Sequence, residues 1–187
     1  MEDKIKEKAS TYLVMAGLTC EQIEGVKALG YFNAPASKSH HLNRPGGLMV
    51  HSLNVTDNIL KLTKTFGYKW QREESPYVIG MLHDLVKCKC YEERPLGAYD
   101  FVDPGWPGHS EASLGIAAVE LGIKLTYKEA IAIRHHMGLW GLNAEGVKDF
   151  NKALTNNAAP IIITHTADWW AARIDEEEAD KDRAPWE

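Results

Sequence analysis

Apolar residues recur every three or four positions over most of the chain, which is the period of an amphipathic helix. Within residues 48–66 this period includes Leu48 and Val55, and His51 occupies the gap between them on the same face. The same period, with capping and stop residues, predicts helices over residues 3–16, 21–29, 48–66, 76–86, 110–121, 127–136, 147–154 and 160–172. The pattern therefore predicts an all-α protein.

Two short alternating runs, residues 88–92 and 99–102, flank a turn that contains Pro95 and Gly97. Such a pattern indicates a small β-hairpin near residues 88–103. A chain of 187 residues can bury one sizeable core, and no change in composition marks a domain boundary. We therefore expect a single domain over residues 1–187, built as a helical bundle with one small hairpin.

The net charge of −5 argues against a protein that coats long nucleic acid with a broad basic face. No apolar segment resembles a signal peptide or reaches membrane-spanning length, so we expect a cytoplasmic protein without membrane contact. The three cysteines are an odd number without zinc-ribbon spacing, and we interpret them as reduced thiols. The mostly acidic residues 175–183 are interpreted as a solvated end.

The pair His83–Asp84 falls near the end of an almost unbroken apolar run that Ser75 and Pro76 open as a helix. Buried imidazole and carboxylate groups are costly unless they are paired or bind a metal, and together they offer one nitrogen and one oxygen ligand. A plain His–Asp hydrogen bond at a helix end is the simpler alternative. Lys87 lies three and four residues further on, hence on the same helical face, where an ammonium could meet an anionic ligand.

Other ionisable residues also lie on apolar helical faces. His51 does so, and Asp168 lies among the apolar positions of residues 160–172, while His109 stands at a loop-to-helix junction. His135 continues the apolar face of the helix that Thr126 caps, and His136 lies about 100° further round it. We therefore expect His135, rather than His136, to point inward.

The order of a histidine, a His–Asp pair and a distant aspartate resembles the HD-domain superfamily of metal-dependent phosphohydrolases, which are helical bundles. His51, His83–Asp84 and Asp168 match that pattern. Two-metal members such as the HD-GYP phosphodiesterases add two histidines between the pair and the last aspartate, for which His109 and either His135 or His136 qualify. The Gly-Tyr-Pro part of the HD-GYP signature is absent.

Four local stretches are similar to the HD domain of YhaM-type 3′-to-5′ exoribonucleases, namely residues 40–48, 108–109, 135–136 and 165–168. The resemblance covers about residues 40–175. Those enzymes carry an additional OB-fold domain that binds nucleic acid, and this chain is too short to contain one. We therefore expect a phosphorylated small molecule or a short nucleic acid as the partner, not a long polymer.

The resemblance implies an enzyme that cleaves phosphoester bonds of a nucleotide, cyclic nucleotide or short oligonucleotide with a metal-activated hydroxide. The ions expected are two divalent iron, manganese, cobalt or zinc ions, with magnesium as an alternative. The first ion would be held by His51, His83, Asp84 and Asp168. The second would be held by His109 and His135, with or without His136 and a bridging Asp84. Catalysis would depend on Asp84 and Lys87, and the phosphate would contact Lys87, with Arg44 and Arg134 as further candidates.

Two other functions fit the same residues. A nucleotidase or deoxynucleotide triphosphohydrolase needs one metal, for which the four-ligand pattern suffices. A non-catalytic module that binds a nucleotide would use the same ligands for stability alone.

Overall fold

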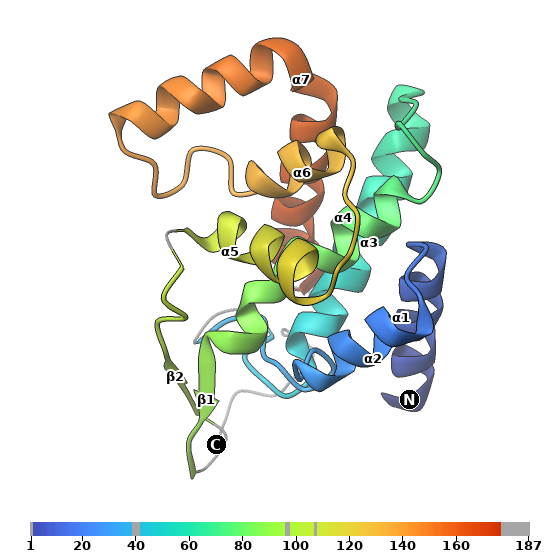
Figure 1. Cartoon of the computed structure of the whole chain (residues 1–187), viewed down its shortest axis with the longest axis vertical. Helices are drawn as coiled ribbons and strands as arrows, with labels where there is room; N and C mark the ends of the chain where they lie inside the picture. Colours follow the sequence, from blue (N-terminus) through green and yellow to red (C-terminus); the bar gives the residue numbers. More distant parts are fainter. Residues whose placement is uncertain (1, 39–41, 96–97, 107, 177–187) are drawn as a thin grey trace.

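The helix predicted over residues 48–66 is the long helix α3 (Gly47–Phe66). It runs through the centre of the computed structural model beside the shorter α4 (Ser75–Leu82) (Figure 1). The structure describes residues 2–38, 42–95, 98–106 and 108–176. Part of the HD-like stretch at residues 40–48 and most of the acidic tail thus lie outside the described residues, and the single domain over residues 1–187 stays a prediction.

The remaining elements confirm the mostly helical prediction. In chain order they are α1 (Glu2–Met15), α2 (Cys20–Ala28), the 3₁₀ turn η1 (Leu85–Lys89), β1 (Tyr91–Glu93), β2 (Tyr99–Phe101), α5 (His109–Gly115), the π-helical turn η3 (Ile116–Glu120), α6 (Tyr127–Arg134), α7 (Ala144–Trp170) and the π-helical turn η4 (Ala171–Asp175).

The hairpin is present and is shorter than expected. Strands β1 and β2 pair antiparallel, with Tyr91 opposite Phe101 and Glu93 opposite Tyr99. Tyr91 packs against the buried core and Tyr99 is 6% exposed, whereas Phe101 is 59% exposed, so one side of the hairpin lies against an otherwise helical fold. No helix in the described part of the chain combines the length and the apolar character needed to cross a bilayer.

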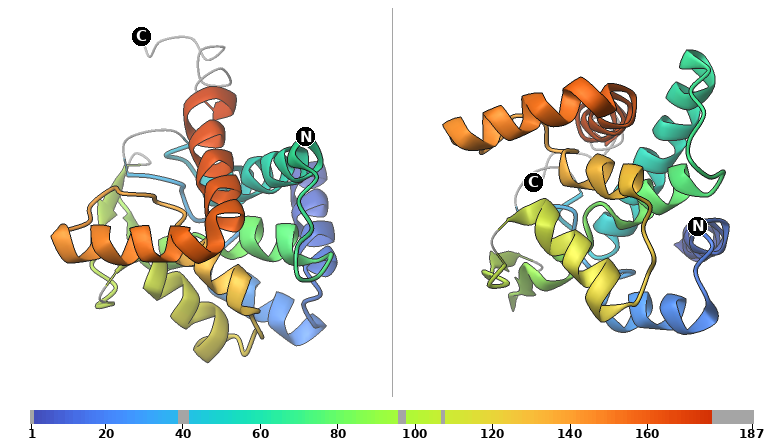
Figure 2. Two further views of the ribbon diagram at one scale, coloured as in Figure 1. Left: turned by 90° about the horizontal axis from the view of Figure 1, so that it is seen from above. Right: turned by 45° about the horizontal axis from the view of Figure 1, so that its top comes forward.

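The last long helix agrees with the sequence prediction in having two parts. Residues 147–154 and 160–172 were expected as two helices, and α7 (Ala144–Trp170) consists of two helical segments joined at a kink, where Asn157 has the non-helical angles φ −140° and ψ 36°. Pro160, three residues later, has no N–H to donate back along the helix, which accounts for the break. Figure 2 shows the first half projecting from the molecule and the second half turning steeply into it. Asp168 of the second half lies 3.0 Å from His51 of α3.

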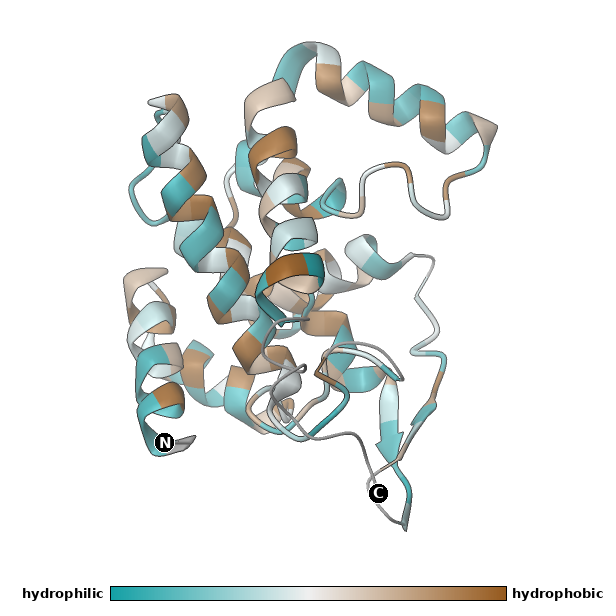
Figure 3. Ribbon diagram, turned by 180° about the vertical axis from the view of Figure 1, so that it is seen from behind, coloured by the Kyte–Doolittle hydropathy of each residue, from teal (hydrophilic) through white to brown (hydrophobic). Residues whose placement is uncertain are grey.

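Two clusters of buried apolar side chains form the core. The first joins α1, α2, α4 and the first half of α3, and the second joins the rest of α3 to α6 and α7. Along α3 the change from one cluster to the other falls between Leu53 and Val55. Figure 3 shows hydrophobic and hydrophilic positions alternating along these helices. The inward-facing polar residues of α3 thus lie near the junction of the two clusters.

A glycine lets α4 approach α3 closely. A Cβ atom at Gly80 would collide with the side chain and backbone of Thr56 on α3. Gly80 also presents its carbonyl oxygen to His83 Nδ1 at 2.9 Å. The two helices that carry His51 and His83 are therefore held at short distance by the absence of one side chain.

Glu129 stabilises the start of α6 from a fully buried position. It forms a capping box with Thr126, the predicted cap, and it accepts hydrogen bonds from Arg72 Nε at 2.7 Å and Ser75 Oγ at 2.7 Å. Burial opposes its ionisation, but the bonds from Arg72, Ser75 and Thr126 outweigh that effect and lower the pKa of Glu129. One carboxylate thus ties α6 to the start of α4.

We expect Glu129→Gln to lower the free energy of unfolding at pH 7 by about 2–4 kcal/mol, because it leaves the Arg72 guanidinium with a weaker partner. A carboxyl group with a lowered folded-state pKa contributes stability above its unfolded pKa, and this contribution is lost as the pH falls through the folded value. The difference between wild type and variant should therefore shrink in acid. Urea denaturation at several pH values measures it, with the exposed Glu73→Gln as a control expected within about 0.5 kcal/mol of wild type.

Candidate metal centre

The His83–Asp84 pair lies where α4 stops. The helix was expected to continue to Val86, but it ends at Leu82, and Asp84 adopts φ −116° and ψ 23° before the 3₁₀ turn η1. Residues three apart eclipse each other in such a turn, and Lys87 Nζ lies 2.6 Å from Asp84 Oδ2. Lys87 therefore lies beside the pair as expected, through a tighter turn than an α-helix, and its ammonium contacts Asp84 itself.

Asp84 is the centre of a cluster of four imidazole rings. Its Oδ1 lies 2.6 Å from His109 Nε2 and 3.3 Å from His136 Nε2. Its Oδ2 lies 3.3 Å from His83 Nε2 and 3.6 Å from His51 Nε2. Every one of these rings presents the same nitrogen, so four Nε2 atoms from α3, the end of α4, α5 and the end of α6 surround one carboxylate.

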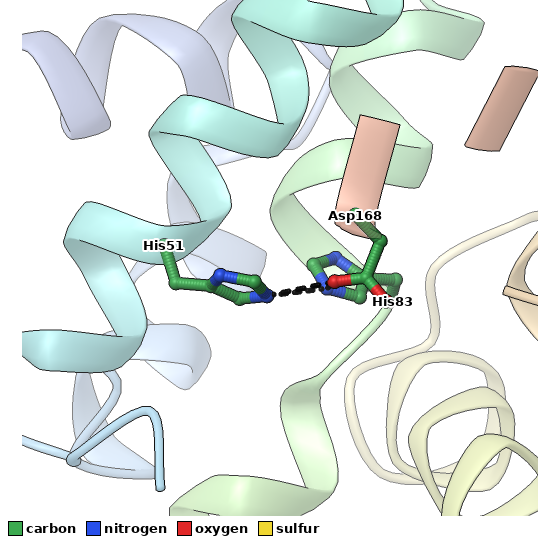
Figure 4. Close-up of side chains that lie close together, drawn as sticks. All are labelled: His51, His83 and Asp168. Carbon is green, nitrogen blue, oxygen red and sulfur yellow. Dashed lines mark hydrogen bonds and ion pairs between the residues drawn. The ribbon is translucent and has the colours of Figure 1, made fainter. Parts of the chain in front are cut away.

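Asp168 closes the cluster from α7. Its Oδ1 lies 3.0 Å from His51 Nε2 and 3.8 Å from His83 Nε2 (Figure 4), and those two nitrogens lie 3.3 Å apart. The residues meet although more than a hundred positions separate Asp168 from His51 along the chain. The kink in α7 makes this meeting possible.

Backbone carbonyl groups fix the orientation of two of the rings. His83 Nδ1 lies 2.9 Å from the Gly80 oxygen, and His136 Nδ1 lies 2.7 Å from the Ile133 oxygen. A carbonyl oxygen can only accept, so both Nδ1 atoms donate, and each neutral ring keeps a lone pair on Nε2. His136 Nε2 has no hydrogen-bond partner among the described residues. Histidines that bind metals are commonly held in this way.

Glu176 holds the third ring and was missed in the sequence. Its Oε1 accepts from His51 Nδ1 at 2.9 Å and from Asn54 Nδ2 at 3.2 Å, and its side chain is 1% exposed. The interpretation of the acidic end as solvated is therefore wrong for Glu176 and for Asp175, whose Oδ2 accepts from Asn58 Nδ2 at 2.8 Å. The helical period that joins Asp168 to the apolar face reaches these two positions when it is extended by two turns.

The charges of the cluster favour a bound cation. Burial opposes ionisation of Asp84, but Lys87, His83 and His109 lower its pKa well below the ordinary value. Burial also disfavours a charged His51, yet the carboxylates of Glu176 and Asp168 raise its pKa to about 10. The cluster thus holds the carboxylates of Asp84, Asp168 and Glu176 with the Lys87 ammonium, and a divalent cation at His51 Nε2 would take the place of a proton there.

Two groups of three residues have ligand atoms within 4.8 Å of one another. One is His51, His83 and Asp168, and the other is His83, Asp84 and His136. Nitrogen and oxygen donors of this kind suit zinc, manganese, iron or cobalt. The buried His and Asp side chains could therefore hold a metal ion, as the sequence predicted.

His135 is buried, as expected, but it lies outside the cluster, whereas His136, which was expected to turn away from the core, is buried as well and belongs to the cluster. Helix α6 ends at Arg134, and His135 leaves the helical conformation with φ −110° and ψ 14°. The 100° step between successive residues no longer applies there, and His136 turns toward Asp84 while His135 packs on Phe150 with ring centroids 5.4 Å apart. His165 Nδ1 donates to the His136 carbonyl at 2.7 Å and holds this turn against α7.

A pocket of about 680 Å³, hereafter the first pocket, opens beside the cluster. Lys87 lines it, and so does Arg173, which the sequence analysis did not single out. The contact of Lys87 with a phosphate stays a prediction. Arg44 is not among its lining residues, and Arg134 instead contacts Glu111 at 3.2 Å beside another pocket. The expected phosphate contacts of Arg44 and Arg134 therefore find no support in the described structure.

Two indole rings form the outer wall of the first pocket. Trp140 is 79% exposed and Trp169 is 62% exposed, although large aromatic side chains usually bury most of their surface. Their exposure leaves ring faces available at the mouth of the pocket.

The arrangement can bind a cation between buried imidazole and carboxylate groups and can receive a ligand in the adjoining pocket. Comparisons with protein-family models, with curated proteins and with solved structures each found no match to this chain.

Proposed function

We propose that the protein is a metal-dependent phosphohydrolase that cleaves a phosphoester bond of a nucleotide, cyclic nucleotide or short oligonucleotide. The observation that carries the proposal is the convergence of four Nε2 atoms on Asp84, beside a pocket lined by Lys87. The resemblance of the sequence to HD-domain phosphohydrolases supports the same chemistry.

Each residue of the cluster has a role in this proposal. His51, His83, Asp84 and Asp168 would hold one ion, and His109, His136 and Asp84 would hold another. Bound ions supply Lewis acidity, which lowers the pKa of water and neutralises charge on the phosphate. Asp84 joins the two ligand sets because its two oxygens face different rings.

Lys87 would contact a phosphate oxygen. Burial opposes its charge, but the Asp84 carboxylate outweighs burial and raises the pKa of Lys87, so the side chain stays an ammonium. Arg173 lies further along the same pocket and adds a second cation. The two would position an anionic ester against the Asp84 cluster.

A screen of the purified protein tests the proposal. Nucleoside monophosphates and triphosphates, cyclic nucleotides and short oligonucleotides would be supplied with Mn²⁺, Fe²⁺, Co²⁺, Zn²⁺ and Mg²⁺ in turn. Cleavage of a diester leaves a phosphomonoester, whereas a nucleotidase releases free phosphate and a triphosphohydrolase releases triphosphate. Nucleotide binding without any product would identify a binding module and contradict the proposal.

Glu176 is expected to set the affinity for metal through His51. Glu176→Gln keeps the shape but removes the charge that raises the basicity of the ring, and we expect about a tenfold loss of affinity, rising to about a hundredfold in Glu176→Ala. Competition with a chelator for Co²⁺, followed by the visible absorption of the bound ion, measures this effect.

Asp175→Asn is the matched control because Asp175 is the adjacent carboxylate and bonds Asn58, which is not in the cluster. Its Co²⁺ affinity should stay within about twofold of wild type. Equal losses in both variants would mean that Glu176 stabilises the end of the helix and has no particular effect on His51.

A further inference from the structure

A second pocket of about 460 Å³ adjoins the metal centre on the side of α5 and the start of α7. His109 lines the second pocket, while Asp84 lines the first, and His109 Nε2 lies only 2.6 Å from Asp84 Oδ1. Met137 and Trp140 line both pockets. The two pockets therefore meet at the cluster and share one wall.

The second pocket contains several polar side chains but does not favour an anion. Its Arg134 is engaged with Glu111, and Asp149 adds another carboxylate, so acidic groups outnumber the single arginine. His135 also lines it, and the buried Nε2 of that ring has no hydrogen-bond partner among the described residues. Such a surface suits an uncharged group with several hydrogen-bonding atoms, as in the sugar and base of a nucleoside.

The first pocket differs because it holds two cations, Lys87 and Arg173, and because its carboxylates, Asp84 and Asp168, are ligands whose charge the proposed ions would neutralise. Lys87 and Arg173 offer positive charge near the cluster, and the exposed rings of Trp140 and Trp169 offer faces on which a flat base can stack. This pocket suits a nucleoside together with the charged phosphate. A phosphate monoester has one substituent and would leave the second pocket unused.

We propose that the substrate is a phosphodiester between two nucleosides, with one nucleoside in each pocket and the phosphate at the contact between Asp84 and His109. This inference rests on the proposed function and specifies its substrate. It also gives Trp140 a role as the wall between the two nucleosides, and it favours the diesterase over the one-metal nucleotidase.

The reaction balances as a simple hydrolysis. The oxygen of water, which keeps one of its protons, bonds to phosphorus. The bond between phosphorus and the ester oxygen of one nucleoside breaks. The electron pair of that bond stays on the ester oxygen, which takes the other proton of water. The products are a nucleoside monophosphate and a free nucleoside.

Filling the second pocket tests the inference. Asp149 is an exposed residue of α7 that lines only this pocket, and Asp149→Trp would occupy it with an indole. Lys152→Trp is the control, because it adds the same side chain to an exposed position of the same helix that lines neither pocket. The substrates would be two adenosines joined by a phosphodiester, and the methyl esters of adenosine 3′- and 5′-monophosphate.

We expect wild type and Lys152→Trp to cleave the dinucleotide with a kcat/KM at least about tenfold above the methyl esters, as the loss of one bound base would predict. Asp149→Trp should lose about tenfold on the dinucleotide alone and change less than about twofold on the methyl esters. Equal effects on both kinds of substrate, or none, would overturn the inference while leaving the proposed function intact.

Binding gives a readout that does not need turnover. Calorimetry would use the dinucleotide analogue in which CH₂ replaces the bridging ester oxygen, and Asp149→Trp should weaken its binding about tenfold relative to Lys152→Trp. If the analogue binds in this manner but no ester is hydrolysed, the pockets are as inferred and only the proposed function fails. If the analogue binds equally to both variants, or not to wild type, the inference is wrong.

Discussion

Asp84→Asn is expected to reduce hydrolysis at least about a thousandfold, which corresponds to about 4 kcal/mol of transition-state stabilisation. The carboxylate faces four imidazole nitrogens and the Lys87 ammonium, and it would bridge the two proposed ions. Asparagine keeps the volume but offers only one oxygen and no charge. Both ligand sets would lose their shared anion.

The measurement combines turnover with metal content and circular dichroism. Asp84→Asn should retain its helical spectrum, although the buried Lys87 loses its counter-ion and the free energy of unfolding falls. Asp103→Asn, an exposed aspartate in the loop before α5, is the control and should keep full activity. A folded Asp84→Asn protein with wild-type turnover would contradict the proposed function.

His136→Ala is expected to weaken metal binding at least about a hundredfold, equal to about 2.7 kcal/mol, and to remove about one metal equivalent from the purified protein. The reason is geometric, because His136 Nε2 lies 3.3 Å from Asp84 Oδ1 with no hydrogen-bond partner among the described residues. The Ile133 carbonyl already holds the other nitrogen of the ring. Elemental analysis and chelator competition measure the loss.

The adjacent histidine supplies the control. His135→Ala removes an imidazole of the same size from the next position, but that ring packs on Phe150 and takes no part in the cluster. Its metal content should equal that of wild type. If His135→Ala lost metal and His136→Ala kept it, His135 would be the metal ligand, as the helical period indicated, and the assignment of His136 to the metal centre would be wrong.

The helices were predictable because their signals are local. Apolar residues that recur every three or four positions, a capping residue and a glycine stop are signals that act within one or two turns. They located α3, α4 and α6 to within a few residues. The burial of His51 and of the His83–Asp84 pair followed from the same repeat. The membership of these residues in an HD-type site rests on resemblance and stays a prediction.

The position of a helix end was not predictable, and it decided which histidine joins the cluster. The apolar period of α6, continued for one more residue, predicted that His135 and not His136 faces the core. The helix instead ends at Arg134, and the following residues form a turn that directs His136 to Asp84. Likewise the sequence predicted a break between residues 154 and 160, but not the direction in which the second part of α7 leaves the kink at Asn157 and carries Asp168 to His51. Both outcomes depend on packing between segments that are distant in the chain.

The sequence by itself determined the helical class, the caps and which residues have a buried face, since these follow from the local preferences of the backbone and from the apolar repeat. Only the tertiary structure decided that His136 and Glu176 accompany His51, His83 and Asp168 around Asp84, and that two pockets meet there. The physical reason is that ligand atoms converge through contacts between different helices, and a contact of 3 Å depends on helix ends, kinks and close approaches that no local pattern encodes.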